Sequence, residues 1–297
     1  MTDVEGGRAA PAASRAGRRQ GHGVVRVRQG APASARGRRA GAVWRVVASA
    51  VPVAVVLALW ELVARSGLVN PRLVPDLGTI AGQLALLLQS PQLGVHVGAS
   101  LTRVVGGFGL AVVAGVPLGI AMARLPACER AVEPLFALGY PVPRIALYPI
   151  FVFLFGIGHL SKILLVALEC LYPIAVHTYH GVRGIDRLYI WSAQNMGATR
   201  WQIVWKVMAP AAAPQAFTGL RVALPIAFII TILTEMVSST EGLGWLVLYA
   251  SASLSQARVF ASLAIVAGMG FAMDRALAIL RNRIVFWERE VALVAIR

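Results

Sequence analysis

Six stretches of this sequence are long and apolar enough to cross a lipid bilayer, and they restrict the fold more than any other feature. They cover residues 46–64, 100–123, 135–156, 162–180, 217–237 and 259–280. A transmembrane helix needs roughly 20 mostly apolar residues. The stretches are continuous and rich in Leu, Val and Ala, unlike the alternating strands of a membrane barrel. The sequence therefore predicts an all-α membrane protein with six transmembrane helices.

The composition and the spacing of these stretches indicate how the chain is organised. Charged residues make up 14% of the chain, whereas a soluble domain carries about 25%. The expected parts are a disordered arginine-rich tail over 1–45, a first transmembrane helix over 46–66, an extracytoplasmic connector with a short surface helix over 67–96, a main transmembrane domain over 97–281 and a C-terminal tail over 282–297.

Lys and Arg residues are distributed unevenly between the two sides of the predicted bundle. If the N-terminus is cytoplasmic, the tail contributes ten arginines and the other cytoplasmic segments contribute ten more Lys and Arg residues. The opposite side then holds Arg72 and Arg258. Because cytoplasmic loops carry the excess of Lys and Arg, we expect both termini in the cytoplasm.

The net charge of +15 would suggest a nucleic-acid-binding protein, but much of it lies in the tail. In residues 1–45 the arginines are interleaved with Ala, Gly and Pro, and large apolar residues are scarce. Such a segment cannot bury enough apolar surface to become ordered. We expect a disordered cytoplasmic tail that touches anionic lipid head groups rather than nucleic acid, with RNA binding as the alternative. A signal peptide is not expected, because the charged region is too long.

The segment 188–210, LYIWSAQNMGATRWQIVWKVMAP, is too polar to cross the bilayer. It is predicted to form two short cytoplasmic helices with a break at Gly197. Thr199 and Gln202 have the spacing of a capping box at the start of the second helix. Pro210 is expected to stop that helix.

The second of these helices carries an apolar stripe at helical spacing. The stripe consists of Trp201, Val204, Trp205 and Met208. A capped, basic, amphipathic helix on the cytoplasmic side fits either a docking element for another protein or an interfacial helix on lipid. The cytoplasmic orientation favours docking.

Arg103, Arg144, Glu169 and Glu235 are among the ionisable residues inside or at the ends of predicted spans, where charge is costly and indicates function. Arg103 lies near the outer end of its span and is expected to snorkel to the head groups. Arg144 follows the broken stretch 141–143, Glu169 lies near the middle of its span, and Glu235 lies near the outer end of another. We expect Arg144, Glu169 and Glu235 to line a translocation path. A structural ion pair or an interfacial position is the alternative for each carboxylate.

The motifs of the common catalytic and cofactor sites are missing from the sequence. The chain contains two lysines, Lys162 and Lys206, and neither follows a glycine-rich P-loop. Neither G-x-S-x-G nor H-E-x-x-H occurs. The two cysteines lack the spacing of a metal site. We therefore expect no catalytic residue, no metal and no bound cofactor, so that any ATP is used by a partner subunit.

Segment 188–210 resembles the cytoplasmic docking loop of bacterial ABC importer permeases, in which an Ala-rich helix and a Gly precede a helix that ends in Pro. The matching residues are Ala193, Gly197, Ala198 and Pro210. The runs GATRWQIVWKVMAPAAAPQAFTGLRVAL, YPVPRIALYPIFVFLFGIGHLSKILLVAL and TEMVSSTEGLGWLV are similar to permeases of the nitrate, sulfonate and taurine group. The resemblance covers about residues 70 to 287.

The resemblance implies the type I ABC importer permease fold in the bacterial inner membrane. Two permease copies would form the path, an extracytoplasmic binding protein would deliver the solute, and two cytoplasmic ATPase subunits would grip the loops. The solute would be a sulfonate, nitrate, taurine or a related organic compound. The docking residues would be Ala193, Gly197, Ala198, Thr199, Trp201, Trp205 and Pro210.

The chain departs from the family pattern at a few positions. Trp191 replaces an acidic residue, Ser192 replaces Ala, and Ala209 replaces a hydrophobic residue before the proline. Glu169 stands where similar permeases more often have a small residue. A secondary transporter or channel working without an ATPase is the competing prediction, and an intramembrane enzyme is a third. The loop and the lack of an obvious inverted repeat favour the permease.

Overall fold

The computed structural model describes residues 51–139 and 142–287, and the chain divides into two units at residue 56. The tail over 1–45 and residues 288–297 lie outside the described residues. In the first unit residues 51–56 are helical. The second unit, which concerns us below, continues with helical residues 57–65. Its other helices are α2 (Leu77–Gln89), α3 (Pro91–Arg124), α4 (Pro126–Gly139), η1 (Arg144–Leu147), α5 (Tyr148–Phe155), α6 (His159–Arg183), α7 (Arg187–Asn195), α8 (Arg200–Ile203), η2 (Val204–Met208), α9 (Ala209–Val237), α10 (Leu243–Ala252) and α11 (Gln256–Ile284).

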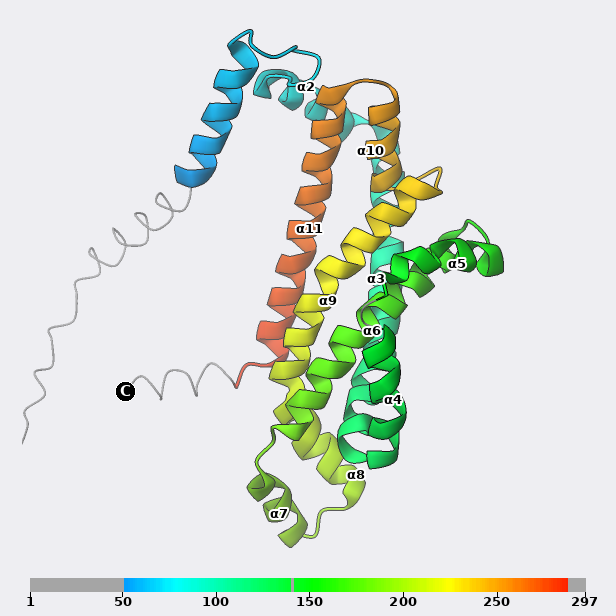
Figure 1. The fold of residues 1–297 in the computed structure, drawn as a ribbon. Helices are drawn as coiled ribbons and strands as arrows, with labels where there is room; N and C mark the ends of the chain where they lie inside the picture. Colours follow the sequence, from blue (N-terminus) through cyan, green and yellow to red (C-terminus); the bar gives the residue numbers. More distant parts are fainter. Residues whose placement is uncertain (1–50, 140–141, 288–297) are drawn as a thin grey trace, which may run out of the picture. The chain divides into compact units, whose positions relative to one another are not determined.

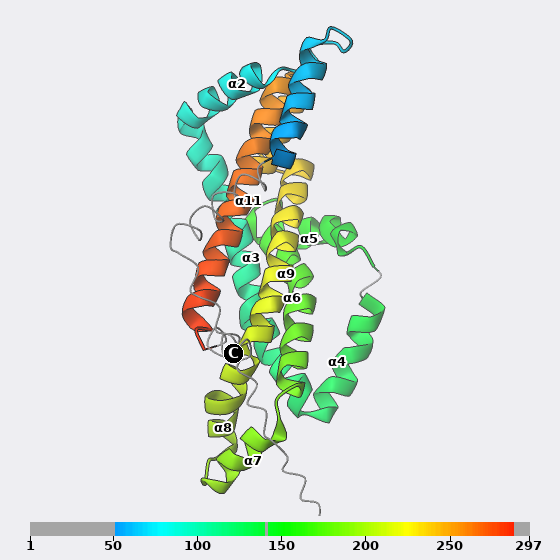
Figure 2. The same ribbon diagram turned by 90° about the vertical axis from the view of Figure 1, so that its left-hand side faces the viewer.

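The core of the second unit lies between α3, α6 and α9, which run side by side (Figures 1 and 2). Its fully buried side chains include Val104 of α3, Ile174 of α6 and Ala223 of α9. Glycines let α3 approach α6 closely, as small residues do between membrane helices. A Cβ at Gly119 would lie 2.5 Å from the carbonyl oxygen of Ala175.

Four helical runs in the described part of the chain are long and apolar enough to span a membrane. These are α3, α6, α11 and the continuous run from Arg200 to Val237 that ends with α9. The nearly all-helical fold agrees with the predicted class, but the count of six helices is not confirmed. The first predicted span, 46–64, lies partly outside the described residues, and α3 begins at Pro91, before the expected end of the connector at residue 96.

The third predicted span, 135–156, is not one straight helix. The chain bends by 90° between α4 and the run Arg144–Phe155. The bend coincides with Pro141-Val142-Pro143, of which Pro141 lies outside the described residues. Proline removes the backbone donor that a continuous helix needs and pushes its predecessor out of helical conformation. This pair of helices counts as a fifth span only if the bent pair is taken together.

The prediction that Pro210 stops the second short helix is wrong. Helical structure continues from Arg200 through η2 into α9, and Pro210 stands in the first turn of α9. The segment η2 is a π-helical turn, in which the Ala209 amide donates to the Val204 carbonyl. The wider turn changes the hydrogen-bonding pattern at the point where the proline lacks its donor. The proline therefore interrupts the pattern without ending the helix.

A buried ion pair joins α3 to α9 at the far end of α9 from η2. Nη1 of Arg103 lies 2.7 Å from Oε1 of Glu235, and the two side chains are 3% and 0% exposed. Ser100 lies 2.8 and 2.9 Å from the two carboxylate oxygens of Glu235. The expectation that Arg103 snorkels to the head groups is therefore wrong, because a charged partner inside the protein offers a better contact than the interface does.

The same polar cluster fixes the start of α10. The Gly244 amide donates to Glu235 at 2.9 Å, and Arg103 donates to the Glu241 carbonyl at 2.9 Å. Gly242 has φ +117°, a conformation that side chains disfavour, and an added Cβ there would collide with the Glu235 carboxylate. The loop between α9 and α10 is thus tied to α3 through both backbone and side-chain groups.

We expect Gly119→Val to destabilise the protein by about 1–3 kcal/mol, the usual result of overpacking. The added side chain would meet the Ala175 carbonyl at 2.5 Å and the Thr178 Cβ at 2.7 Å. Gly109→Val is the matched control on the same helix, because a Cβ there has nothing within 4 Å. Thermal unfolding in detergent measures both variants. Equal loss of stability in the two would contradict the close helix contact.

We expect Arg103→Met to cost about 3–5 kcal/mol, because it leaves the buried Glu235 carboxylate without its cation. The double variant Arg103→Met/Glu235→Met should recover part of this loss. Arg65→Met is the control, since it removes the Arg65–Glu61 pair, whose arginine is 71% exposed, and should change stability by at most about 1 kcal/mol. Thermal unfolding of the three purified variants gives the comparison. A loss for Arg103→Met as small as that of the control would refute a stabilising role.

Candidate functional site

The segment 188–210 forms a helical hairpin made of α7, α8 and η2, as predicted. Asp186 begins α7 by accepting a hydrogen bond from the Leu188 amide at 2.9 Å. Thr199 begins α8 within a complete capping box, whose bonds to Gln202 measure 2.9 and 3.3 Å. Figure 1 shows the hairpin projecting beyond the end of α6.

Gly197 makes the turn between the two helices of the hairpin. Its φ is +78°, which glycine adopts at little cost. The Gly197 amide donates to the Gln194 carbonyl at 2.9 Å, and the Ala198 amide donates to the Ala193 carbonyl at 3.0 Å. These two bonds form a Schellman motif, the common end of a helix at glycine. The turn at Gly197 therefore depends only on residues that are close together in the sequence, which is why the sequence predicts it.

The predicted apolar stripe of the hairpin divides into an inner and an outer part. Met208 is 1% exposed and packs with Ala193, Ile203 and other apolar residues between the hairpin and the ends of α6 and α9. Trp201 and Trp205 are 70% and 62% exposed, with ring centroids 6.1 Å apart. The π-helical turn breaks the regular spacing on which the single-stripe prediction depended.

Further large apolar side chains are exposed on the hairpin. Those exposed by more than half are Leu188, Tyr189, Trp191 and Met196. Aromatic residues and Met are enriched where proteins meet. Among the docking residues expected from the sequence, Ala193 is buried in the hairpin, whereas Gly197, Thr199 and Pro210 remain exposed.

A second candidate site is a cavity of about 580 Å³ between α6, α9 and the segment that precedes η1. Arg144 and Glu169 both line it, and their charged atoms Nη1 and Oε2 lie 3.3 Å apart. The two side chains are 15% and 16% exposed. Tyr172 and His177 add polar groups to the wall, and Val222 adds apolar surface. The cavity therefore presents both signs of charge.

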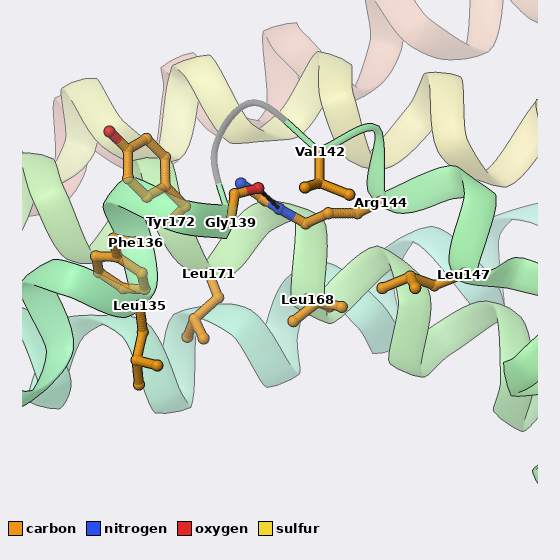
Figure 3. A pocket seen from close by; sticks show the side chains of 9 residues that line it. All are labelled: Leu135, Phe136, Gly139, Val142, Arg144, Leu147, Leu168, Leu171 and Tyr172. Carbon is orange, nitrogen blue, oxygen red and sulfur yellow. Dashed lines mark hydrogen bonds between the residues drawn. The ribbon is translucent and has the colours of Figure 1, made fainter.

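Arg144 also lines a more apolar cavity of about 340 Å³ (Figure 3). Leu168 and Leu171 line that cavity, and Arg144 lies 5.7 Å from the centre of the Tyr172 ring. Nε of Arg144 donates to the Gly139 carbonyl at 3.5 Å. Arg144 thus lines both a polar and an apolar cavity and contacts the Glu169 carboxylate and the Gly139 carbonyl.

The third residue expected on the path, Glu235, does not line these two cavities. It is fully buried in the ion pair with Arg103 described above, which matches the alternative of a structural ion pair. The sequence did not predict that Ser100 and Gly242 belong to this cluster, nor His96, whose Nδ1 accepts from the Gly242 amide at 3.2 Å. The run EGLG at 241–244 was a usable signal, because it brings two glycines and an acidic residue to the end of a span. Among the described residues, no three His, Cys, Asp or Glu side chains gather as a metal site.

Comparison with known proteins places this architecture in a family. Residues 115–286 match the model of the binding-protein-dependent transport system inner membrane component. The chain is 35% identical to the taurine transport system permease protein of Escherichia coli (strain K12), over 83% of this chain and 92% of the relative.

Two further relatives have different named solutes. The putative aliphatic sulfonates transport permease protein of Bacillus subtilis (strain 168) is 30% identical over 79% of this chain and 85% of the relative. The formylaminopyrimidine transport permease protein of Halalkalibacterium halodurans is 32% identical over 79% of this chain and 93% of the relative. The chain thus belongs to the family of binding-protein-dependent transport system inner membrane components, as an ABC transporter permease of the taurine and sulfonate group.

Proposed function

We propose that this chain is the transmembrane permease subunit of an ATP-driven importer. A cytoplasmic ATPase grips the hairpin 188–210, an extracytoplasmic binding protein delivers the solute, and a second permease copy completes the path. The excess of Lys and Arg on the hairpin side supports cytoplasmic termini. The solute is a small sulfonate, nitrate, taurine or a related organic compound.

The exposed face of Trp201 and Trp205 carries this proposal. Two large aromatic side chains at 70% and 62% exposure lie on a helix that is capped at one end and continuous with α9 at the other. Aromatic anchors of this kind supply much of the binding energy of protein interfaces. A secondary transporter needs no such face, and this difference separates the two hypotheses.

The continuity of the hairpin with α9 supports a mechanism for coupling. A force applied at Trp201 passes along helical backbone, without an intervening loop, to Glu235 at the other end of α9. Val222 of α9 lines the cavity that Arg144 and Glu169 share. ATP binding therefore changes the path by moving α9 as a rigid element against α6. It favours one packing through contacts that differ between the two states of the hairpin.

The charges in the cavity support a role in handling a polar solute. Glu169 lies 3.3 Å from Arg144, so the anion-binding capacity of the guanidinium is partly used within the protein. An anionic solute gains binding energy from Arg144 only when it displaces or screens the Glu169 carboxylate. This arrangement binds weakly, as a transport path requires, because a path must release what it binds.

We expect Trp201→Ala/Trp205→Ala to weaken association with the ATPase by at least about 30-fold, the effect of losing one strong interface anchor. Stability of the permease should change little, because both side chains face solvent. Phe271→Ala is the control, since Phe271 is 69% exposed on α11, away from the hairpin. Co-purification of the permease with a co-expressed ATPase partner measures the effect. Undiminished capture of the ATPase by the double variant would overturn the docking assignment.

We expect Glu169→Gln to lower the KM for uptake of an anionic sulfonate by about tenfold, which corresponds to about 1.4 kcal/mol. The substitution removes the negative charge next to Arg144 and leaves the guanidinium available. Glu133→Gln is the control, because Glu133 is exposed and lines neither cavity around Arg144. Uptake is measured against concentration at several pH values and at equal membrane abundance. Identical curves for wild type and Glu169→Gln would leave the carboxylate a structural role alone.

A further inference from the structure

The ion pair between Arg144 and Glu169 uses only part of the hydrogen-bonding capacity of the two side chains. Nη1 of Arg144 lies 3.3 Å from Oε2 of Glu169 and donates to the Glu169 carbonyl at 3.4 Å. Nε of Arg144 donates to the Gly139 carbonyl at 3.5 Å. Among the described residues, nothing forms a hydrogen bond with Nη2 of Arg144 or with Oε1 of Glu169. One cationic donor group and one anionic acceptor are therefore unused.

Solvent reaches both of these unused groups. In the part of the chain that the structure describes, Nε of Arg103 is the one fully buried side-chain nitrogen or oxygen that lacks a partner. Nη2 of Arg144 and Oε1 of Glu169 also lack a partner, so they are not fully buried. The two side chains line the same cavity of about 580 Å³, and small-molecule sites have volumes of about 300–1,000 Å³. A solute in this cavity therefore meets both groups.

The charges of this cavity wall balance each other. Arg144 and Glu169 are its charged residues, and with His177 neutral its formal charge is zero. A simple anion at Nη2 of Arg144 adds a negative charge close to the Glu169 carboxylate, which repels it. A simple cation at Oε1 of Glu169 is repelled by the guanidinium for the same reason. A solute with one positive and one negative end meets an opposite charge at each end and keeps the site neutral.

Much of the remaining wall is apolar. The apolar residues include Val142, Val176, Val222 and Ile226. Apolar walls with a few placed polar groups are typical of sites for small molecules. These side chains suit the short carbon chain that joins the two charged ends of such a solute.

We propose that this cavity selects a small zwitterion, an amino sulfonate, over a simple anion. The inference rests on the proposed function as a permease and narrows its solute class. The sulfonate accepts from Nη2 of Arg144 and the ammonium donates to Oε1 of Glu169, while the contact between the two side chains persists. Glu169 therefore determines specificity, because it repels solutes that carry only a negative charge and binds the ammonium of those that carry both charges.

Binding of two probes to the purified full-length chain in detergent tests this selectivity. Taurine has an ammonium and a sulfonate, and isethionate has the same carbon chain and sulfonate with a hydroxyl in place of the ammonium. Isothermal titration calorimetry without the binding protein gives each Kd, so the binding protein's own specificity does not enter. Wild type should bind taurine about tenfold more tightly than isethionate, the effect of one hydrogen bond to a charged group. Equal affinities, tighter binding of isethionate, or binding of neither probe would overturn the proposal.

Glu169→Gln should reduce this ratio of affinities to about one, because the amide offers the ammonium no charge and no longer repels isethionate. Glu133→Gln is the matched control and should keep the wild-type ratio, since Glu133 is exposed and lines neither cavity around Arg144. An unchanged ratio in Glu169→Gln, or a lost preference in Glu133→Gln, would refute the role of Glu169. The wild-type comparison decides the proposal alone if Glu169→Gln does not fold.

ATP-driven uptake of taurine into liposomes that contain the permease, its ATPase and the binding protein tests the proposed function separately. Uptake together with equal binding of the two probes would refute the zwitterion site and leave the importer intact. A preference for taurine without ATP-dependent uptake would refute the importer and leave the site.

Discussion

The fold of the second unit depends on one buried ion pair, Arg103–Glu235, at the end of α9 remote from the hairpin. Two charges that leave water lose their hydration, and only close pairing with full hydrogen bonding compensates for that loss. The carboxylate meets this requirement with Ser100, Arg103 and the Gly244 amide. Since these partners come from α3 and α10 and the carboxylate itself from α9, it is satisfied only when all three helices are in place. Apolar packing alone would allow many near-equivalent arrangements of membrane helices, whereas this pair favours one.

The close approach of α3 to α6 sets the second constraint. Glycine leaves room for the facing backbone, and Gly119 meets the Ala175 carbonyl where any side chain would collide. α6 is therefore positioned by its contact with α3, and with it Glu169, the carboxylate opposite Arg144. The polar cavity depends on a rigid wall, because a guanidinium and a carboxylate 3.3 Å apart are sensitive to small helix shifts. The small residues between α3 and α6 therefore determine both how the two helices pack and where Glu169 lies in the polar cavity.

The sequence predicted best the features that depend on neighbouring residues. The capping box at Thr199 and the turn at Gly197 involve donors and acceptors a few residues apart, and both were found as expected. The burial of Arg103 depends on Glu235, 132 residues away, and no local pattern reveals such a partner. The prediction that Pro210 ends the helix was wrong for a different reason. A π-helical turn accommodates the backbone donor that proline lacks, whereas an α-helix does not. The bend before Arg144 was visible as a pair of prolines, but hydrophobicity alone indicated a straight span.

The π-helical turn Val204–Met208 also sets the rotational phase between the hairpin and the membrane helix. A π turn contains one residue more than the α-helical geometry would use, and one residue corresponds to a rotation of roughly 100° about the helix axis. The direction in which Trp201 points, relative to the face of α9 that holds Val222 and Glu235, is therefore encoded in a single extra residue. Loss of one residue from η2 would leave Trp201 on the hairpin and still turn it about a quarter-turn away. The angular alignment of the two ends of this helix is a property of backbone length, separate from the chemistry of either end.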